Sequence, residues 1–68
     1  MRINPHALVV VRERTGLKQA QLAARAEVSP GYLSKLENGK APGTPDVILR
    51  VAKALDVSLA AITLEGAA

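Results

Sequence analysis

The chain has 68 residues and a formal net charge of +3, with one histidine and no cysteine. It therefore has neither a disulfide framework nor a thiolate metal site, and His6 alone cannot form a histidine cluster. Its longest apolar run is far shorter than the roughly 20 residues of a membrane span, and no signal peptide is visible. We expect one soluble, cytoplasmic domain over residues 1–68. One histidine, one tyrosine and six scattered carboxylates supply no nucleophile–base pair, so we expect no enzyme, no cofactor and no small-molecule ligand.

The positive charge is concentrated in the first 40 residues. Residues 1–16 hold three basic residues and one acidic residue, and residues 17–40 hold four basic and two acidic residues. Residues 41–68 hold two basic and three acidic residues. This distribution fits a surface that binds a polyanion, and it also fits a generic solvated surface.

An Asn-Pro start signal and a glycine stop predict the first helix over residues 5–15. Three residues should share its buried side: Leu8, Val11 and Thr15. Val10 points outward, either as an ordinary surface residue or as a contact with a second subunit. Three consecutive valines also suit a strand, but one strand without a partner would not be stable, so we expect a helix.

The stretch from Leu17 to Lys40 predicts two short helices joined by a tight turn. Apolar residues recur at helical spacing from Lys18 or Gln19 to Ala26, and again over residues 30–37. Ser29-Pro30 starts the second helix, and Asn38-Gly39 ends it because both residues tolerate left-handed backbone. Helices joined this tightly cross steeply, which leaves one face of the second helix bare. On that face we expect Gly31, Ser34, Lys35 and Asn38, with Tyr32 at its edge.

Side chains near the start of the second predicted helix suit an anion. Lys18 is a poor cap whose charge opposes the helix dipole, and a nearby polyanion would relieve that conflict. Gln19 can offer its amide outward to a phosphate oxygen, although an exposed glutamine is also an ordinary helix former.

A glutamate lies beside the apolar stripe of the third predicted helix and needs a partner. Arg12 lies at the matching margin of the first helix, so a bidentate pair with Glu37 would fix how these two helices cross. Solvent exposure of both side chains is the alternative.

The remaining residues predict a loop and two more helices. Thr44-Pro45-Asp46 starts a fourth helix after a loop containing proline and glycine. Its buried stripe should be Ile48, Val51, Ala52 and Leu55. Ser58 should cap a last short helix carrying Leu59 and Ile62, and residues 65–68 should fray.

The segment GLKQAQLAARAEVSPGYLSKLENGK, followed by a proline-containing loop and VILRVAKALDVSLAAI, closely resembles the phage repressor and Cro family of helix-turn-helix domains, also called the Xre-like family. The match runs without a gap from Leu8 to Ile62. The positions that fit the family pattern are Gly16, Leu17, Gln19, Leu22, Ala23, Val28, Ser29, Leu33, Ser34, Glu37, Asn38, Gly39, Lys40, Leu55, Val57, Ser58 and Leu59. The resemblance implies an all-α, compact five-helix lambda-repressor-like bundle, with its core over about residues 5–64 and helices 2 and 3 as the helix-turn-helix.

The same resemblance implies roles for individual residues. Gln19 and Asn38 look like phosphate contacts, and Arg12 and Glu37 look like the buried ion pair of such domains. Lys18 departs from the family pattern, which usually has a threonine or serine cap there.

A second departure lies at the start of the recognition helix. Pro30 and Gly31 stand where phage repressors often place glutamines that read base edges, and neither has a side-chain donor. Base reading should therefore shift to Lys35, Ser34 and Tyr32, while Gly31 lets the backbone come close. A lysine in the major groove favours the guanine O6 and N7 acceptors, although Lys35 also fits a phosphate contact or a solvated surface. Tyr32 also fits packing on sugar and phosphate, or covering the edge of the core.

These features together imply a sequence-specific double-stranded DNA-binding protein, a small repressor-like transcriptional regulator with helix 3 in the major groove, nucleoid-associated when bound. One such module covers a small interface, so we expect a homodimer at least on DNA. The expected contact residues are Lys18, Gln19, Ser29, Gly31, Tyr32, Ser34, Lys35, Asn38 and Lys40. The alternative is a protein-interaction module of the same fold, such as an antitoxin, anti-repressor or polymerase-binding factor, with an apolar surface made of Val9, Val10 and Val47.

Overall fold

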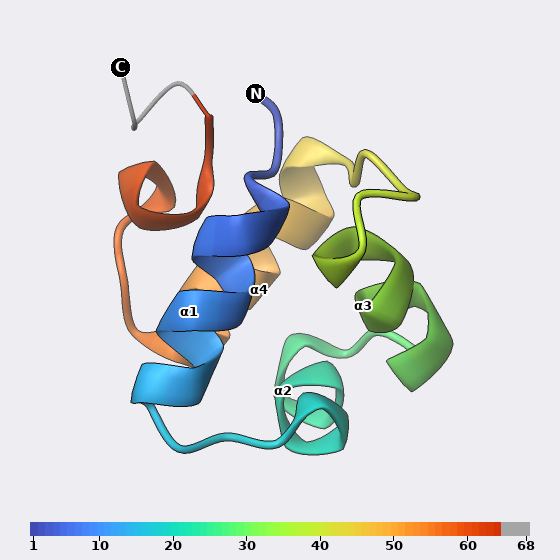
Figure 1. Ribbon diagram of the computed structural model, residues 1–68, viewed down its shortest axis with the longest axis vertical. Helices are drawn as coiled ribbons and strands as arrows, with labels where there is room; N and C mark the ends of the chain where they lie inside the picture. The colour runs from blue at the N-terminus through green and yellow to red at the C-terminus, as the bar shows by residue number, and fades with distance from the viewer. Residues whose placement is uncertain (65–68) are drawn as a thin grey trace.

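The computed structural model describes residues 1–64, which form four α-helices and a short 3-10 helix (Figure 1). In chain order the elements are α1 (Pro5–Arg14), α2 (Gln19–Ala26), α3 (Pro30–Glu37), α4 (Pro45–Leu55) and η1 (Leu59–Ile62). The predicted all-helical fold is confirmed for this part of the chain. The predicted count of five helices is corrected, because the last element is a single 3-10 turn. The fraying predicted for residues 65–68 lies outside the described residues.

Three of the four α-helices begin at a capping side chain followed by proline. The side-chain oxygens of Asn4, Ser29 and Thr44 each accept a hydrogen bond from the backbone N–H three residues later, at 3.1 to 3.2 Å. Each bond satisfies one of the amides that a first turn leaves free. Ser58 makes no side-chain bond at the start of η1, so its predicted capping role is wrong.

The core is one apolar cluster to which every helix contributes. Its fully buried large side chains are Leu8, Leu22, Leu33, Leu36, Ile48, Val51 and Ile62. The buried stripe predicted for α4 is confirmed, and Val47 extends it with only 9% of its surface exposed. The prediction that Val47 points outward is wrong, because it stands one helical turn before Val51 on the same face.

The predicted burial of Thr15 is also wrong. Helix α1 ends at Arg14, and Thr15 is exposed as the cap that follows it. Its hydroxyl donates a hydrogen bond to the carbonyl oxygen of Arg12 at 2.6 Å. Val11 does pack against the core, whereas Val10 is half-buried and lies outside that cluster.

The two ends of the described chain are paired. The backbone N–H of Asn4 donates to the carbonyl oxygen of Ile62 at 2.9 Å, and Leu64 donates to the carbonyl oxygen of Arg2 at 3.0 Å. Ile3, only 5% exposed, forms an isolated antiparallel bridge with Thr63. Ile3 therefore joins the N-terminal segment to the hydrophobic core.

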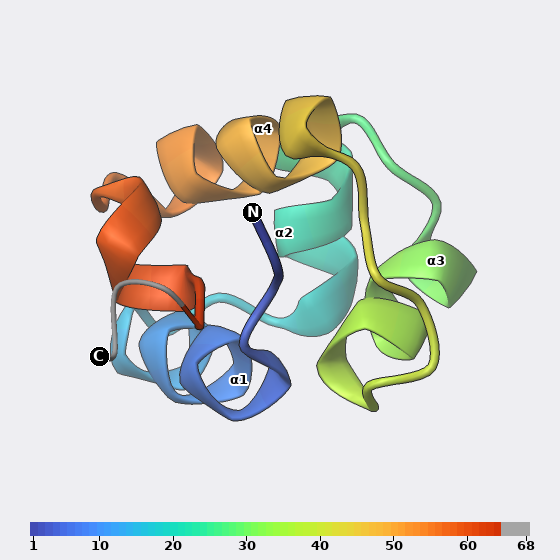
Figure 2. The ribbon, with the colours of Figure 1, turned by 90° about the horizontal axis from the view of Figure 1, so that it is seen from above.

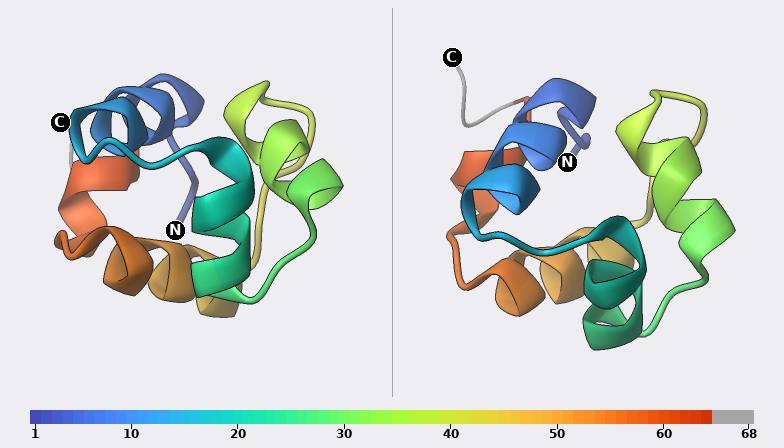
Figure 3. Two further views of the ribbon diagram at one scale, coloured as in Figure 1. Left: turned by 90° about the horizontal axis from the view of Figure 1, so that it is seen from below. Right: turned by 60° about the horizontal axis from the view of Figure 1, so that its bottom comes forward.

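Helix α3 lies at one edge of the molecule. It contacts α1 and α2, while α2 packs on α4, and η1 packs on both α1 and α4. Viewed from above and from below, α3 has other helices on its inner side only (Figures 2 and 3). No helix within residues 1–64 combines the length and the apolar character that crossing a membrane requires.

Candidate nucleic-acid interface

The chain changes direction between α2 and α3 at Glu27, whose backbone conformation is left-handed. Glu27 has φ +59°, and the N–H of Val28 donates to the carbonyl oxygen of Ala23 at 3.0 Å. Arg50 of α4 braces this turn, because its Nη1 donates to the carbonyl oxygen of Glu27 at 3.1 Å. This brace has no local signal in the sequence, because Arg50 and Glu27 are 23 residues apart. Nε of Arg50 lies 3.2 Å from Oδ2 of Asp46 without forming a hydrogen bond.

Helix α3 has an inward apolar side and an outward polar side. Leu33 and Leu36 are fully buried. On the outward side Gly31 and Lys35 are exposed, and Ser34 is half-buried. Two of the residues expected on the outer face are therefore exposed, and the third is partly covered.

Tyr32 lies at the edge of that face and is half-buried against the core. This packing agrees with one of the roles predicted for Tyr32, which is to cover the edge of the core. Its backbone N–H is taken by the Ser29 hydroxyl oxygen.

An ion pair joins α1 to the end of α3. Nε of Arg12 is 2.8 Å from Oε2 of Glu37, and Nη2 is 3.2 Å from Oε1. Nη1 of the same guanidinium donates to the carbonyl oxygen of Leu17 at 2.9 Å. Because the side chains of Arg12 and Glu37 are 15% and 5% exposed, the pair is largely shielded from solvent.

Gln19 is part of the same network. Its Nε2 donates to Oε1 of Glu37 at 3.1 Å, and its side chain is half-buried. One N–H group of the amide that was expected to point outward therefore donates to the carboxylate. The start of α2 is thereby tied to the end of α3.

Lys18 precedes α2 and is exposed, without capping the helix through its side chain. Its backbone N–H donates instead to Oε1 of Gln21 at 2.8 Å. The first turn of α2 contains no acidic residue, so no carboxylate of this helix offsets the charge of the exposed Lys18 at the positive end of the helix dipole.

The end of α3 is held by Asn38 and Gly39. Nδ2 of Asn38 donates to the carbonyl oxygen of Ser34 at 2.8 Å and to its hydroxyl oxygen at 3.3 Å. Asn38 has φ −98°, so its backbone is not left-handed here. Gly39, with φ +73°, is the left-handed residue that ends the helix. Lys40 follows and is exposed.

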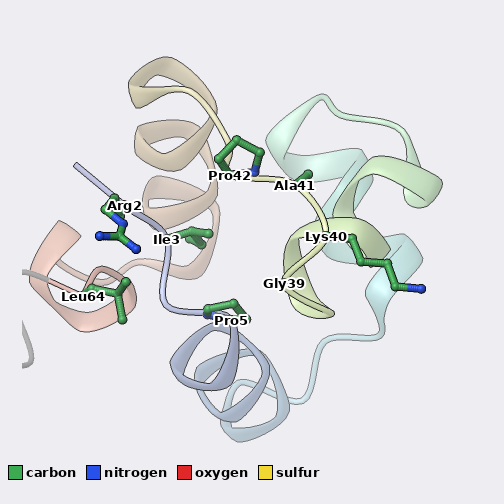
Figure 4. A pocket seen from close by; sticks show the side chains of 8 residues that line it. All are labelled: Arg2, Ile3, Pro5, Gly39, Lys40, Ala41, Pro42 and Leu64. Atoms are coloured by element: carbon green, nitrogen blue, oxygen red, sulfur yellow. The ribbon is translucent and has the colours of Figure 1, made fainter.

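A hollow of about 340 Å³ opens beside this unit, between the N-terminal segment and the loop before α4 (Figure 4). Ile3, Pro5, Ala41 and Pro42 give it an apolar lining, and the Lys40 side chain extends away from it. No residue of α3 itself lines the hollow. Within residues 1–64 no three histidine, aspartate or glutamate residues gather closely enough to hold a metal ion.

Comparison with known proteins identifies the arrangement. A family model described as a helix-turn-helix domain matches residues 7–63. A crystal structure of the clp gene regulator ClgR from Corynebacterium glutamicum is 38% identical, with a TM-score of 0.80 over 82% of this chain and 60% of that one. The chain thus spans less than two thirds of that regulator's chain. No significant relative was found among curated protein sequences.

Two further structures show the same fold. The restriction-modification controller protein C.AhdI from Aeromonas hydrophila has a TM-score of 0.82 at 28% identity, over 84% of this chain and 86% of that one. The P22 c2 repressor, solved with a synthetic operator, has a TM-score of 0.78 at 22% identity, over 87% and 89% of the two chains. With its sequence matched from residue 7 to residue 63, this chain belongs to the helix-turn-helix domain family, in its phage-repressor or Xre-like form.

Proposed function

We propose that this chain is a sequence-specific double-stranded DNA-binding protein, a small repressor-like transcriptional regulator that inserts α3 into the major groove. One observation carries the proposal. The inward side of α3 is fixed by two buried leucines and an ion pair, whereas its outward side keeps Gly31, Ser34 and Lys35 available. A helix held rigidly with a bare polar face is the element that enters a groove in helix-turn-helix recognition.

Two kinds of contact follow from the geometry. Lys35 and Ser34 suit base edges, because they lie on the face of α3 that other helices leave uncovered. Side chains around this face suit phosphates: Lys18, Gln19, Ser29, Asn38 and Lys40. Gln19 retains one amide N–H besides the one that donates to Glu37, so it can orient α3 and contact a phosphate at once.

The positive charges of this unit are free for such contacts. Lys18, Lys35 and Lys40 are exposed, whereas the carboxylate of Glu37 is neutralised within the ion pair. Related proteins agree with the proposal: ClgR is a gene regulator and C.AhdI is a controller protein.

We propose that two copies bind together on two half-sites. A single module buries a small area, and half-sites about one DNA turn apart allow both copies to face the same side of the duplex. The bound form is therefore a two-fold dimer, and the selected DNA should be palindromic.

Selection of bound fragments from random duplex DNA at two salt concentrations tests the function. We expect an enriched palindrome whose affinity falls about 1,000-fold between 50 and 200 mM salt, since about six exposed lysines in two copies release counterions from the DNA. An absence of enrichment, together with no binding at the lower salt concentration, would reject the proposal.

The protein-interaction alternative has less support than the sequence suggested. Of its three proposed surface valines, Val47 is in the core, and Val9 and Val10 are half-buried. An apolar protein interface would not weaken steeply with salt, so the same titration separates the two functions.

A further inference from the structure

The glycine in α3 has no structural explanation within the protein. Gly16, Gly39 and Gly43 have φ of +73° to +76°, a conformation that favours glycine. Gly31 lies inside α3 without such a φ, and a Cβ added there would meet no heavy atom within 4 Å. Because glycine is the least favourable helix residue after proline, the fold would be more stable with almost any other residue at this position.

The side chain next to Gly31 in α3 is apolar. Pro30 is exposed beside it and has no donor. The oxygen of the Ser29 hydroxyl already accepts a hydrogen bond from the N–H of Tyr32 at 3.1 Å. The first turn of α3 therefore presents a proline ring and a bare Cα beside the backbone N–H of Gly31 and the exposed Ser29 hydroxyl, whereas the side-chain donors of the outward face lie one turn later at Ser34 and Lys35.

A surface of this kind recognises bases through shape. Among the base edges of the major groove, the C5 methyl group of thymine is the one apolar feature. Resting on the proposed function, we infer that Gly31 is a specificity-determining residue whose missing side chain leaves room for a thymine methyl group. Each half-site then carries a thymine opposite the first turn of α3.

The inference is tested by removing a methyl group from the base and by adding one to the protein. The probe is the duplex selected by the wild-type protein, with its thymines replaced one at a time by deoxyuridine. For the wild type we expect about fourfold weaker binding at one thymine of each half-site, because a buried methyl contact is lost. Gly31→Ala should bind the thymine duplex about tenfold more weakly, and should recover when deoxyuridine stands at that same position.

Stability measurements separate this effect from a folding defect. Gly31→Ala should melt at a higher temperature than the wild type, because alanine favours the helix. Ala60→Gly is the control: it removes one methyl group from an exposed residue of η1, on the opposite side of the molecule from α3 (Figure 2), and should leave the thymine preference unchanged.

Two results would overturn the inference. One is a Gly31→Ala variant that binds the selected duplex as tightly as the wild type. The other is weaker binding that no deoxyuridine substitution restores. Both leave the proposed function intact, whereas a wild-type protein that selects no DNA would refute the function itself.

Discussion

Arg12 and Glu37 join α1 to the last turn of α3 through two hydrogen bonds, from Nε at 2.8 Å and Nη2 at 3.2 Å. Gln19 adds a third donor to the same carboxylate at 3.1 Å. Three segments that are distant in the sequence thus converge on one buried charge. The position of α3 relative to α1 and α2 depends on this carboxylate.

Glu37→Ala should lower the free energy of unfolding by about 3 kcal/mol, because the guanidinium of Arg12 and the amide of Gln19 lose their acceptor while shielded from water. Urea unfolding followed by circular dichroism measures this loss. The double variant Arg12→Met/Glu37→Met should lose less, since neither charge is then left unpaired.

The ion pair on α4 supplies the control for this experiment. Asp46 is 77% exposed, so Asp46→Ala should change the unfolding free energy by at most about 1 kcal/mol. Equal losses for Asp46→Ala and Glu37→Ala would contradict a structural role for the buried pair.

Lys18→Ala should weaken binding to all DNA sequences alike. The exposed ammonium stands before α2, where it suits a phosphate and carries no base information. The slope of the logarithm of affinity against the logarithm of salt concentration should fall by about one unit per copy. Gln19→Ala is the comparison: it should also lower stability, by about 1 kcal/mol, because its bond to Glu37 is lost. A change in sequence preference with Lys18→Ala would contradict the phosphate assignment.

Local signals in the sequence predicted most of the helical structure. The Ser29 and Thr44 caps and their following prolines act over three residues, so they are visible without any tertiary information. The left-handed reversal at Gly39 is likewise local. The boundaries of α3 and the start of α4 followed from these signals, whereas those of α2 followed from the helical spacing of its apolar residues.

Contacts between distant residues were harder to predict. The bridge between Ile3 and Thr63 joins opposite ends of the chain and has no periodic signal. The amide of Gln19 turned toward Glu37 because that carboxylate lies within its reach, which depends on how α2 and α3 cross. The Arg50 brace depends on the same tertiary arrangement. The identity of the outer-face residues was predictable, whereas the bonds that orient them were not.

Glu27→Gly should stabilise the protein. A left-handed conformation costs a non-glycine residue about 1 to 2 kcal/mol, and the entropy of an unfolded glycine offsets part of the gain. We expect a net gain of about 0.5 to 1 kcal/mol, visible as a melting temperature raised by about 4 °C. Asp56→Gly, at φ +58°, should gain less, because aspartate tolerates this region better.

The matched control lies one helix turn earlier. Ala24 is exposed within α2 and has helical geometry, so Ala24→Gly should lower stability by about 1 kcal/mol. If Glu27→Gly and Ala24→Gly shifted the melting temperature in the same direction, the left-handed turn would not be a source of strain.

Lys35→Ala should weaken DNA binding by removing a contact with one base pair. Lys35 is exposed on the outer face of α3, and an ammonium group in the major groove favours the O6 and N7 acceptors of guanine. We expect affinity for the selected duplex to fall by about 1 to 3 kcal/mol, with lost discrimination at that one position. Competition among duplexes that differ by single base pairs measures both quantities. Lys53→Ala removes the same charge from the exposed side of α4 and should leave the base preferences unchanged. Equal weakening on every duplex would move Lys35 from the base edges to the phosphates.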